Sequence, residues 1–224
     1  MYEIQILYSI AFLLTMKLNY QQLSDRLKGP LPGPLAHEPL RATPIGLVKP
    51  RFDHRTPPKP GSVIILLYEE NDQLLFPLTK RPEYLGTHGG QISLPGGKAE
   101  PGESIIDTAL REAEEEIGIP KQHIEVVGTL SEFFVVPSNF MVSPVVAFIT
   151  GKPAFNPDPK EVVKILCGSI NELVKEDAVQ TKEIMAARMF PMLAPHFQVE
   201  NEVVWGATAM ILNEFRMVIK EIID

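Results

Sequence analysis

The chain has 224 residues, 45% of them hydrophobic, which is enough for one sizeable core. Its formal net charge of −7 argues against nucleic acid as the main partner, because phosphate backbones bind clustered basic surfaces. Cys167 is the single cysteine, so the sequence excludes an internal disulfide framework and a cysteine-rich zinc site. We expect Cys167 to be a small buried hydrophobic residue in a protein of the reducing cytoplasm.

The N-terminus carries an apolar stretch, residues 4–16, that is only 13 residues long. A membrane span needs about 20 residues, so no stable span is expected here. Glu3 precedes the stretch, where a secretory signal would carry basic residues. We therefore interpret residues 1–15 as an extension outside the fold, with Met16 as an alternative start. A weak membrane anchor is the other interpretation.

Residues 16–60 are expected to form a short helix and a proline-rich arm. The helix is predicted over residues 18–28, with leucines at its apolar positions. Nine prolines then stand between Pro30 and Pro60. Because proline lacks an amide hydrogen and restricts the backbone, this composition excludes regular helix and most strand pairing. The arm would either lie over the domain or reach a partner chain.

The rest of the chain, residues 61–224, is expected to form one α/β domain. Runs of β-branched and other apolar residues predict strands at 62–68, 74–80, 124–130, 143–150 and 162–167. Helices are predicted over 104–117, over 169–176 and after Trp205. The last helix repeats apolar residues at helical spacing, namely Ile211, Phe215, Val218, Ile219 and Ile222. An early and a late helix among strands indicate a sheet covered on both faces.

The helix predicted at 104–117 carries a group of carboxylates. Ser104 and Asp107 form an S-x-x-D capping pattern at its start, and Gly118 is placed to end it. Helical geometry puts six apolar residues on one arc: Ile105, Ile106, Ala109, Leu110, Ala113 and Ile117. A neighbouring arc carries three acidic residues, Glu112, Glu115 and Glu116, whereas Glu114 points elsewhere. Like charges at this spacing cost about 0.2 to 0.5 kcal/mol per pair.

A divalent cation would compensate this crowding of negative charge. Mg²⁺ selects oxygen ligands and commonly takes one or two carboxylates. A glycine-rich loop, LPGGKAEPGE, leads into the helix, and Gly96 and Gly97 allow its backbone to approach a ligand or metal closely. A solvated acidic surface is the alternative, but the loop and the adjoining apolar arc favour a metal site.

The same residues resemble the Nudix signature, G-x5-E-x7-R-E-U-x-E-E-x-G-U, in which U is an aliphatic residue. Every specified position is matched, by Gly97, Glu103, Arg111, Glu112, Ala113, Glu115, Glu116, Gly118 and Ile119. The resemblance implies an α/β fold, a Nudix-type α/β/α sandwich with a mixed β-sheet between helices. It also implies Mg²⁺ or Mn²⁺ bound by Glu112, Glu115 and Glu116. Glu103, Arg111 and Gly118 would support the loop and helix, and Glu103 could also join the metal site.

By the same resemblance, the reaction is hydrolysis of a nucleoside diphosphate linked to another moiety. A carboxylate would take the proton of the attacking water. Glu115 or Glu116 is the usual candidate base within the signature. Glu161, just before a predicted strand, is our choice of a base from outside it. The alternative is that Glu161 is simply an exposed residue.

The stretch upstream of the signature, residues 78–97, resembles the coenzyme A pyrophosphatase branch of this family. The branch pattern is L-L-T-x-R-S, a spacer and H-x-G-Q-x-x-F-P-G-G. Nine residues match it: Leu78, Thr79, Arg81, His88, Gly90, Gln91, Pro95, Gly96 and Gly97. Pro82 replaces the serine, Leu94 replaces the aromatic residue, and Gly86 stands where an arginine is common. That last departure leaves the anionic end of the substrate with one fewer positive partner.

This branch resemblance implies cleavage of coenzyme A and its thioesters to 3′,5′-ADP and 4′-phosphopantetheine or the acyl equivalent. The implied substrate contacts are Arg81, His88, Gly89, Gly90, Gln91, Gly96 and Gly97. The expected partner is therefore a small nucleotide, and the sequence leaves a homodimer open. A Nudix enzyme for ADP-ribose or dinucleotides, and a non-catalytic ligand sensor, are the alternatives.

Overall fold

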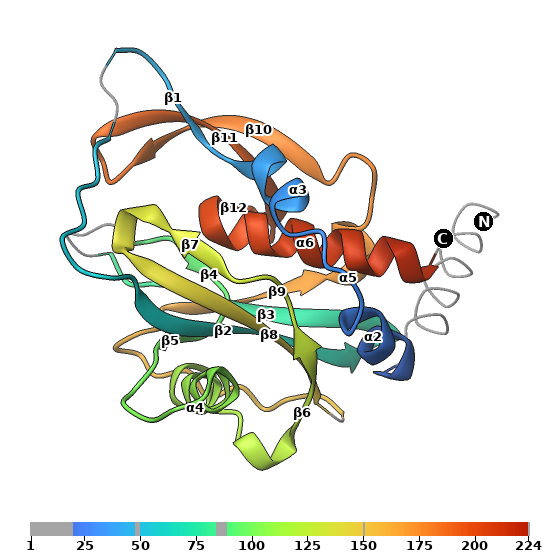
Figure 1. Ribbon diagram of the computed structural model, residues 1–224. Coiled ribbons are helices and arrows are strands. Elements are labelled where there is room, and N and C mark those ends of the chain that lie inside the picture. Colours follow the sequence, from blue (N-terminus) through green and yellow to red (C-terminus); the bar gives the residue numbers. More distant parts are fainter. Residues whose placement is uncertain (1–19, 48–49, 84–88, 150, 224) are drawn as a thin grey trace.

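The computed structural model describes residues 20–47, 50–83, 89–149 and 151–223 (Figure 1). Residues 1–15 lie outside this range. The α-helices are α2 Tyr20–Leu27, α3 Pro34–His37, α4 Ile105–Ile117, α5 Ile170–Leu173 and α6 Gly206–Ile223. Short 3₁₀ helices are η1 Glu38–Leu40, η2 Lys121–His123 and η3 Val136–Ser138. Within the described ranges, no helix combines the length and apolar character needed to cross a membrane.

The strands form two β-sheets. The central sheet contains β2 Lys59–Glu70, β3 Gln73–Lys80, β4 Ile92–Ser93, β5 Gly96–Lys98, β6 Ile124–Thr129, β7 Phe133–Val135, β8 Phe140–Ile149 and β9 Lys164–Ser169. The second sheet contains β1 Thr43–Pro44, β10 Val179–Ala186, β11 Phe190–Val199 and β12 Glu202–Trp205.

The central sheet is mixed and lies between helices. Its strand order is β4-β3-β2-β8-β6, with β5 paired to β2, β7 to β8 and β9 to β3. β2 and β8 are parallel, whereas the other pairs are antiparallel. α4 covers one face of this sheet and α6 covers the other (Figure 1). The structure therefore confirms the predicted α/β/α sandwich.

The continuous apolar run of β2 is explained by burial on both faces. Ile64 and Leu66 belong to the core beneath α4, where Ala113 is fully buried. Ile65 and Leu67 belong to the core beneath α6, which includes Phe215. Successive side chains of a strand point to opposite faces, so a strand covered on both sides needs apolar residues at every position.

Three features of the fold differ from the sequence-based expectations. Ile105 and Ile106 are 40% and 38% exposed, because they lie in the first turn of α4, before the part that packs on the sheet. The second sheet was not predicted at all over residues 179–205. Cys167 is only half-buried, and its Sγ accepts a hydrogen bond from Tyr68 Oη at 3.0 Å.

The proline-rich arm is more regular than expected. Helix α3 begins at Pro34, which is compatible with its first turn because the amide hydrogen there has no partner inside the helix. Strand β1 pairs with β11 through Thr43 and Pro44. Ala36 and Leu40 are buried, so this part of the arm lies over the domain. The prediction that the prolines exclude regular helix was therefore wrong for residues 34–37, whereas the two-residue pairing of β1 is compatible with the exclusion of most strand pairing.

A buried carboxylate ties the arm to α6. Glu214 is fully buried, and its Oε1 accepts hydrogen bonds from Gly33 N at 3.0 Å and Ser131 Oγ at 2.6 Å. Its Oε2 lies 3.0 Å from His37 Nε2. Burial alone would raise the pKa of Glu214, but the hydrogen bonds from His37, Ser131 and Gly33 outweigh burial and hold this pKa below its usual value.

Replacement of Glu214 by glutamine is expected to lower the free energy of unfolding by about 1 to 3 kcal/mol, because buried donors lose a charged acceptor. The pKa of Glu214 is lower in the folded than in the unfolded protein, so its contribution is complete above the unfolded pKa. It is lost as the pH falls through the folded pKa. The difference in unfolding free energy between the wild type and Glu214→Gln should thus be constant from about pH 6 to 8. It should shrink below about pH 4.5.

Urea unfolding across this pH range measures the effect. Glu221→Gln is the matched control, since Glu221 lies on the same helix with its side chain 51% exposed. This control should stay within about 0.5 kcal/mol of the wild type. A role for the ionised carboxylate would be contradicted if both variants lost the same unfolding free energy. It would also be contradicted if the stability loss of Glu214→Gln grew as the pH fell.

Candidate active site

Helix α4 positions the acidic residues, and its two ends follow the predicted caps. Ser104 Oγ accepts a hydrogen bond from Asp107 N at 3.1 Å, and Asp107 Oδ2 accepts one from Ser104 N at 3.3 Å. Gly118 ends the helix in the left-handed conformation, with φ 70°. These caps satisfy backbone groups that the helix itself leaves unpaired. The predicted start and end of this helix are confirmed.

Glu116 lies buried beneath the glycine-rich loop and is only 2% exposed. Its Oε2 accepts a hydrogen bond from Gly96 N at 3.1 Å, and its Oε1 lies 3.5 Å from Arg81 Nη2. Arg81 Nη2 is also 3.4 Å from the carbonyl oxygen of Gly96. Burial raises the pKa of Glu116 to about 7, although the charge of Arg81 and the hydrogen bond from Gly96 oppose the shift.

Glu112 lies one helical turn away and packs directly against Gly97. A Cβ atom on Gly97 would lie 2.4 Å from Glu112 Oε1, so this contact requires glycine. Glu112 is 8% exposed, and burial raises the pKa of its carboxyl group. The nearby charges of Glu115 and Glu161 raise it further, whereas Arg111 opposes the shift. Two carboxylates are thus held in a site that disfavours their charged forms.

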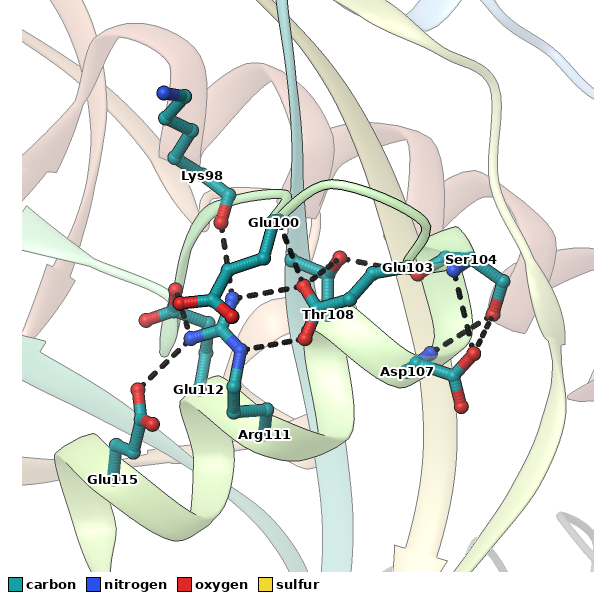
Figure 2. Close-up of polar contacts among 9 residues, drawn as sticks. All are labelled: Lys98, Glu100, Glu103, Ser104, Asp107, Thr108, Arg111, Glu112 and Glu115. Atoms are coloured by element: carbon teal, nitrogen blue, oxygen red, sulfur yellow. Dashed lines mark hydrogen bonds and ion pairs between the residues drawn. The ribbon is translucent and has the colours of Figure 1, made fainter.

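Arg111 is the centre of the polar contacts in Figure 2. Its Nε donates to Glu103 Oε1 at 2.7 Å, and its Nη1 lies 2.8 Å from Glu112 Oε1 and from Glu115 Oε2. Its Nη2 also donates to the carbonyl oxygen of Lys98 at 3.0 Å. The hydrogen bond from Arg111 lowers the pKa of Glu103 to about 2. Arg111 therefore joins the loop to the helix and sets the position of two carboxylates.

The predicted base candidates have different surroundings. The Glu115 side chain is 58% exposed and pairs with Arg111, whereas Glu116 is buried. Glu161 is exposed, as the alternative interpretation proposed. Its charge nevertheless contributes to the raised pKa of Glu112 and of Glu116. Its loop is held to α4 by a hydrogen bond from Asp158 N to the carbonyl oxygen of Glu116, at 3.2 Å.

The predicted substrate contacts are brought together only in part. Arg81, Gly96 and Gly97 meet at the carboxylates, while His88 lies outside the described residues. Gln91 and Gly90 lie on the connection after Arg81, where Arg81 N donates to the carbonyl oxygen of Gln91 at 3.1 Å. Gly90 N donates to the carbonyl oxygen of Pro82 at 3.1 Å, and Gly89 precedes it in the same turn.

The donor set fits a hard divalent cation. Glu112, Glu115 and Glu116 offer only oxygen ligands, and two of them carry buried negative charge that a cation would neutralise. Gly97 leaves the space beside Glu112 free of a side chain. Across the part of the chain that the structure describes, no three acidic, histidine or cysteine side chains already form a metal-binding group. Arg111 holds Glu112 and Glu115 by direct ion pairs instead.

Comparison with known proteins shows the family to which the chain belongs. The family model described as NUDIX domain matches residues 58–201. The chain belongs to the NUDIX domain family. Its Nudix relatives include "Nudix hydrolase 22, chloroplastic" of Arabidopsis thaliana, 36% identical over 76% of this chain and 58% of the relative. "Uncharacterized Nudix hydrolase NudL" of Pectobacterium atrosepticum is 34% identical over 64% of this chain and 74% of that protein. The chain thus spans less than two thirds of the Arabidopsis Nudix protein.

Solved Nudix structures are similar to parts of this chain. A MutT/nudix family protein from Enterococcus faecalis has a TM-score of 0.49 and 16% identity, covering 76% of this chain and 66% of that chain. The binary complex of a C. elegans Ap4A hydrolase has a TM-score of 0.44 and 16% identity, covering 52% of this chain and 83% of that one.

Proposed function

We propose that this Nudix protein is a metal-dependent hydrolase that cleaves a diphosphate linkage in a small nucleotide. The observation that carries the proposal is the pair of buried carboxylates, Glu112 and Glu116, held against Gly96 and Gly97 by Arg111 and Arg81. A structural acidic surface would be exposed and would not need two glycines for its packing. The names of the relatives as Nudix hydrolases support the same reaction class.

The residues of this site would divide the chemistry among them. Glu112, Glu115 and Glu116 would hold Mg²⁺ or Mn²⁺, which when bound supplies charge neutralisation of the diphosphate and a more acidic water. Arg81 reaches the same site and would orient a phosphate oxygen. Glu116 is one candidate acceptor for the proton of the attacking water: burial raises its pKa to about 7 without metal, and a bound cation would lower it. Glu115, which pairs with Arg111, and the exposed Glu161 are the other candidate proton acceptors.

For the substrate, we propose coenzyme A and its thioesters. The support is the LTKRPEYLGTHGGQISLPGG stretch, residues 78–97, which leads into the site and contributes Arg81, Gly96 and Gly97 to it. Cleavage of the diphosphate would release 3′,5′-ADP and 4′-phosphopantetheine, or the acyl form of the latter. ADP-ribose and dinucleotides carry the same type of linkage and are the competing substrates.

A substrate panel tests both the reaction class and the proposed substrate. It contains coenzyme A, acetyl-CoA, ADP-ribose, NADH and an oxidised nucleoside triphosphate, each with Mg²⁺ or Mn²⁺. We expect the largest kcat/KM for coenzyme A or its thioester, with no turnover in chelator. A larger kcat/KM for ADP-ribose or NADH would refute the proposed substrate but keep the reaction class. Tight binding of a nucleotide with no cleavage of any panel member would favour the ligand-sensor alternative.

A further inference from the structure

The arginines that contact the carboxylates are already paired with acidic partners. Arg111 pairs with Glu103, Glu112 and Glu115, and Arg81 faces Glu116. Lys80 at the end of β3 pairs with Glu202 of β12 at 2.6 Å. The chain as a whole has a formal net charge of −7, which repels a polyanionic ligand. Any further phosphate on a substrate therefore needs positive charge from another part of the fold.

The arm provides such charge at the same end of the central sheet. Residues 50–59 run along this end and lead into β2 (Figure 1). Asn139 Nδ2 donates to the carbonyl oxygens of Thr56 and Pro57 at 3.2 and 3.3 Å, which fixes the arm against the start of β8. β2 then pairs with β5, where Gly61 lies opposite Lys98. Lys98 directly follows Gly97, so the arm adjoins the glycine-rich loop.

Four basic residues of the arm and the adjoining loop are exposed: Arg51, Arg55, Lys59 and Lys98. Within the described residues, none of the four forms an ion pair, and Lys59 Nζ lies 5.7 Å from the centre of the Phe140 ring. Asp53 and Glu100 are the exposed acidic residues of the same two segments. The exposed charged residues of these two segments therefore have a positive net charge, whereas the net charge of the whole chain is negative.

Aromatic rings alternate with these charges. Phe52 is 42% exposed and stacks on His54, with ring centres 6.4 Å apart and an interplanar angle of 12°. Phe134, which is 36% exposed, meets His54 edge to face at 6.3 Å. Exposed aromatic rings provide stacking surfaces for nucleobases, and adjacent lysines and arginines provide partners for phosphate.

We propose that residues 51–59 of the arm, with Lys98, form a second subsite that binds a nucleoside bearing a phosphate outside the cleaved diphosphate. The base would stack on the Phe52 and Phe134 side of this surface, and the additional phosphate would contact Arg55 and Lys59. This subsite deepens the proposed function, because it rests on that function for the bond that is cleaved.

Nucleotide binding to the full chain without a divalent metal tests the subsite separately from catalysis. Calorimetric titrations at low salt compare adenosine 3′,5′-bisphosphate with 5′-AMP as the probes. We expect the wild type to bind the bisphosphate about tenfold more tightly, which corresponds to one good charge-assisted contact. The variant Arg55→Ala/Lys59→Ala should bind the two nucleotides equally. Phe52→Ala should weaken both to a similar extent and keep the preference.

Lys182→Ala is the matched control, because Lys182 is an exposed lysine on β10 of the second sheet. It should keep both the affinity and the preference for the bisphosphate. Equal affinity of the wild type for the two nucleotides, or an unchanged preference in Arg55→Ala/Lys59→Ala, would overturn the subsite. Failure of the proposed function has a different signature: the bisphosphate preference is intact, but no diphosphate in the substrate panel is cleaved.

Discussion

Replacement of Glu116 by glutamine is expected to reduce kcat about a thousandfold or more, a loss typical for a residue that acts as part of a catalytic unit. Glutamine has nearly the same shape and can still accept the hydrogen bond from Gly96 N. It cannot carry the negative charge that a cation would bind or the proton that a base would take. Steady-state hydrolysis of the best panel substrate measures the loss.

The same variant should make the metal-free protein more stable at high pH. The pKa of Glu116 is raised to about 7 in the folded protein, so ionisation of this buried group opposes folding. Below the unfolded pKa the penalty is absent, because the carboxyl group is protonated in both states. It grows as the pH rises from the unfolded pKa to the folded pKa, then levels off, and is at most about 3 kcal/mol near pH 8. Glu116→Gln removes this penalty.

Urea unfolding in chelator at pH 5 and pH 8 checks this result. The stability gain of Glu116→Gln should be under about 1 kcal/mol at pH 5 and approach its full size at pH 8. Glu114→Gln is the control, since Glu114 is exposed on the same helix and takes no part in the ion pairs of Arg111. It should change neither turnover nor stability. Full activity of Glu116→Gln would remove this residue from the catalytic site.

Replacement by alanine is expected to affect mainly activity at Gly97 and mainly stability at Gly96. A Cβ on Gly97 would lie 2.4 Å from Glu112 Oε1, at the end of a side chain that can turn away. A Cβ on Gly96 would lie 2.3 Å from the carbonyl oxygen of Ser62 and 2.6 Å from Val63 Cα, which are backbone atoms of the central strand. Gly96 also has φ 153°, a conformation that side chains disfavour.

Gly97→Ala should therefore lose about a hundredfold or more in kcat/KM, because Glu112 would move away from the position in which we propose that it binds the cation. It should destabilise the protein by only about 1 to 2 kcal/mol. Gly96→Ala should lose about 3 kcal/mol or more of stability, since β2 and β5 must separate. Thermal unfolding and hydrolysis assays on both proteins distinguish the two outcomes. A stable but inactive Gly96→Ala protein, or an unfolded Gly97→Ala protein, would contradict the distinction.

The elements with strong local signals could be predicted from the sequence. The helix carrying the carboxylates has a capping box at its start and glycine at its end, and both appear in the structure. Strand β2 is a continuous apolar run, and it is buried on both faces. The placement of Glu112 and Glu116 beside the apolar core also followed from helical periodicity alone, because both lie within two turns of one regular element.

The remaining features depend on pairing between distant segments. β11 contains Pro191 and Pro195, which argue against a paired strand, and its partner β1 comes from the arm. The contact of Arg81 with Glu116 depends on how the residue after β3 meets Gly96 of β5, which no local pattern specifies. The exposed position of Ile105 likewise depends on where α4 meets the sheet rather than on the composition of the helix.

The link between Gly33 and Glu214 constrains the order in which this protein can complete its fold during synthesis. The two residues are 181 positions apart, and Asn213 holds the carbonyl oxygen of Ala36 across 177 positions. The early segment therefore cannot form these hydrogen bonds until Asn213, the donor, and Glu214, the acceptor, have been synthesised. Contacts of such high sequence separation form slowly, and until then the leucines of the early segment are open to chaperones.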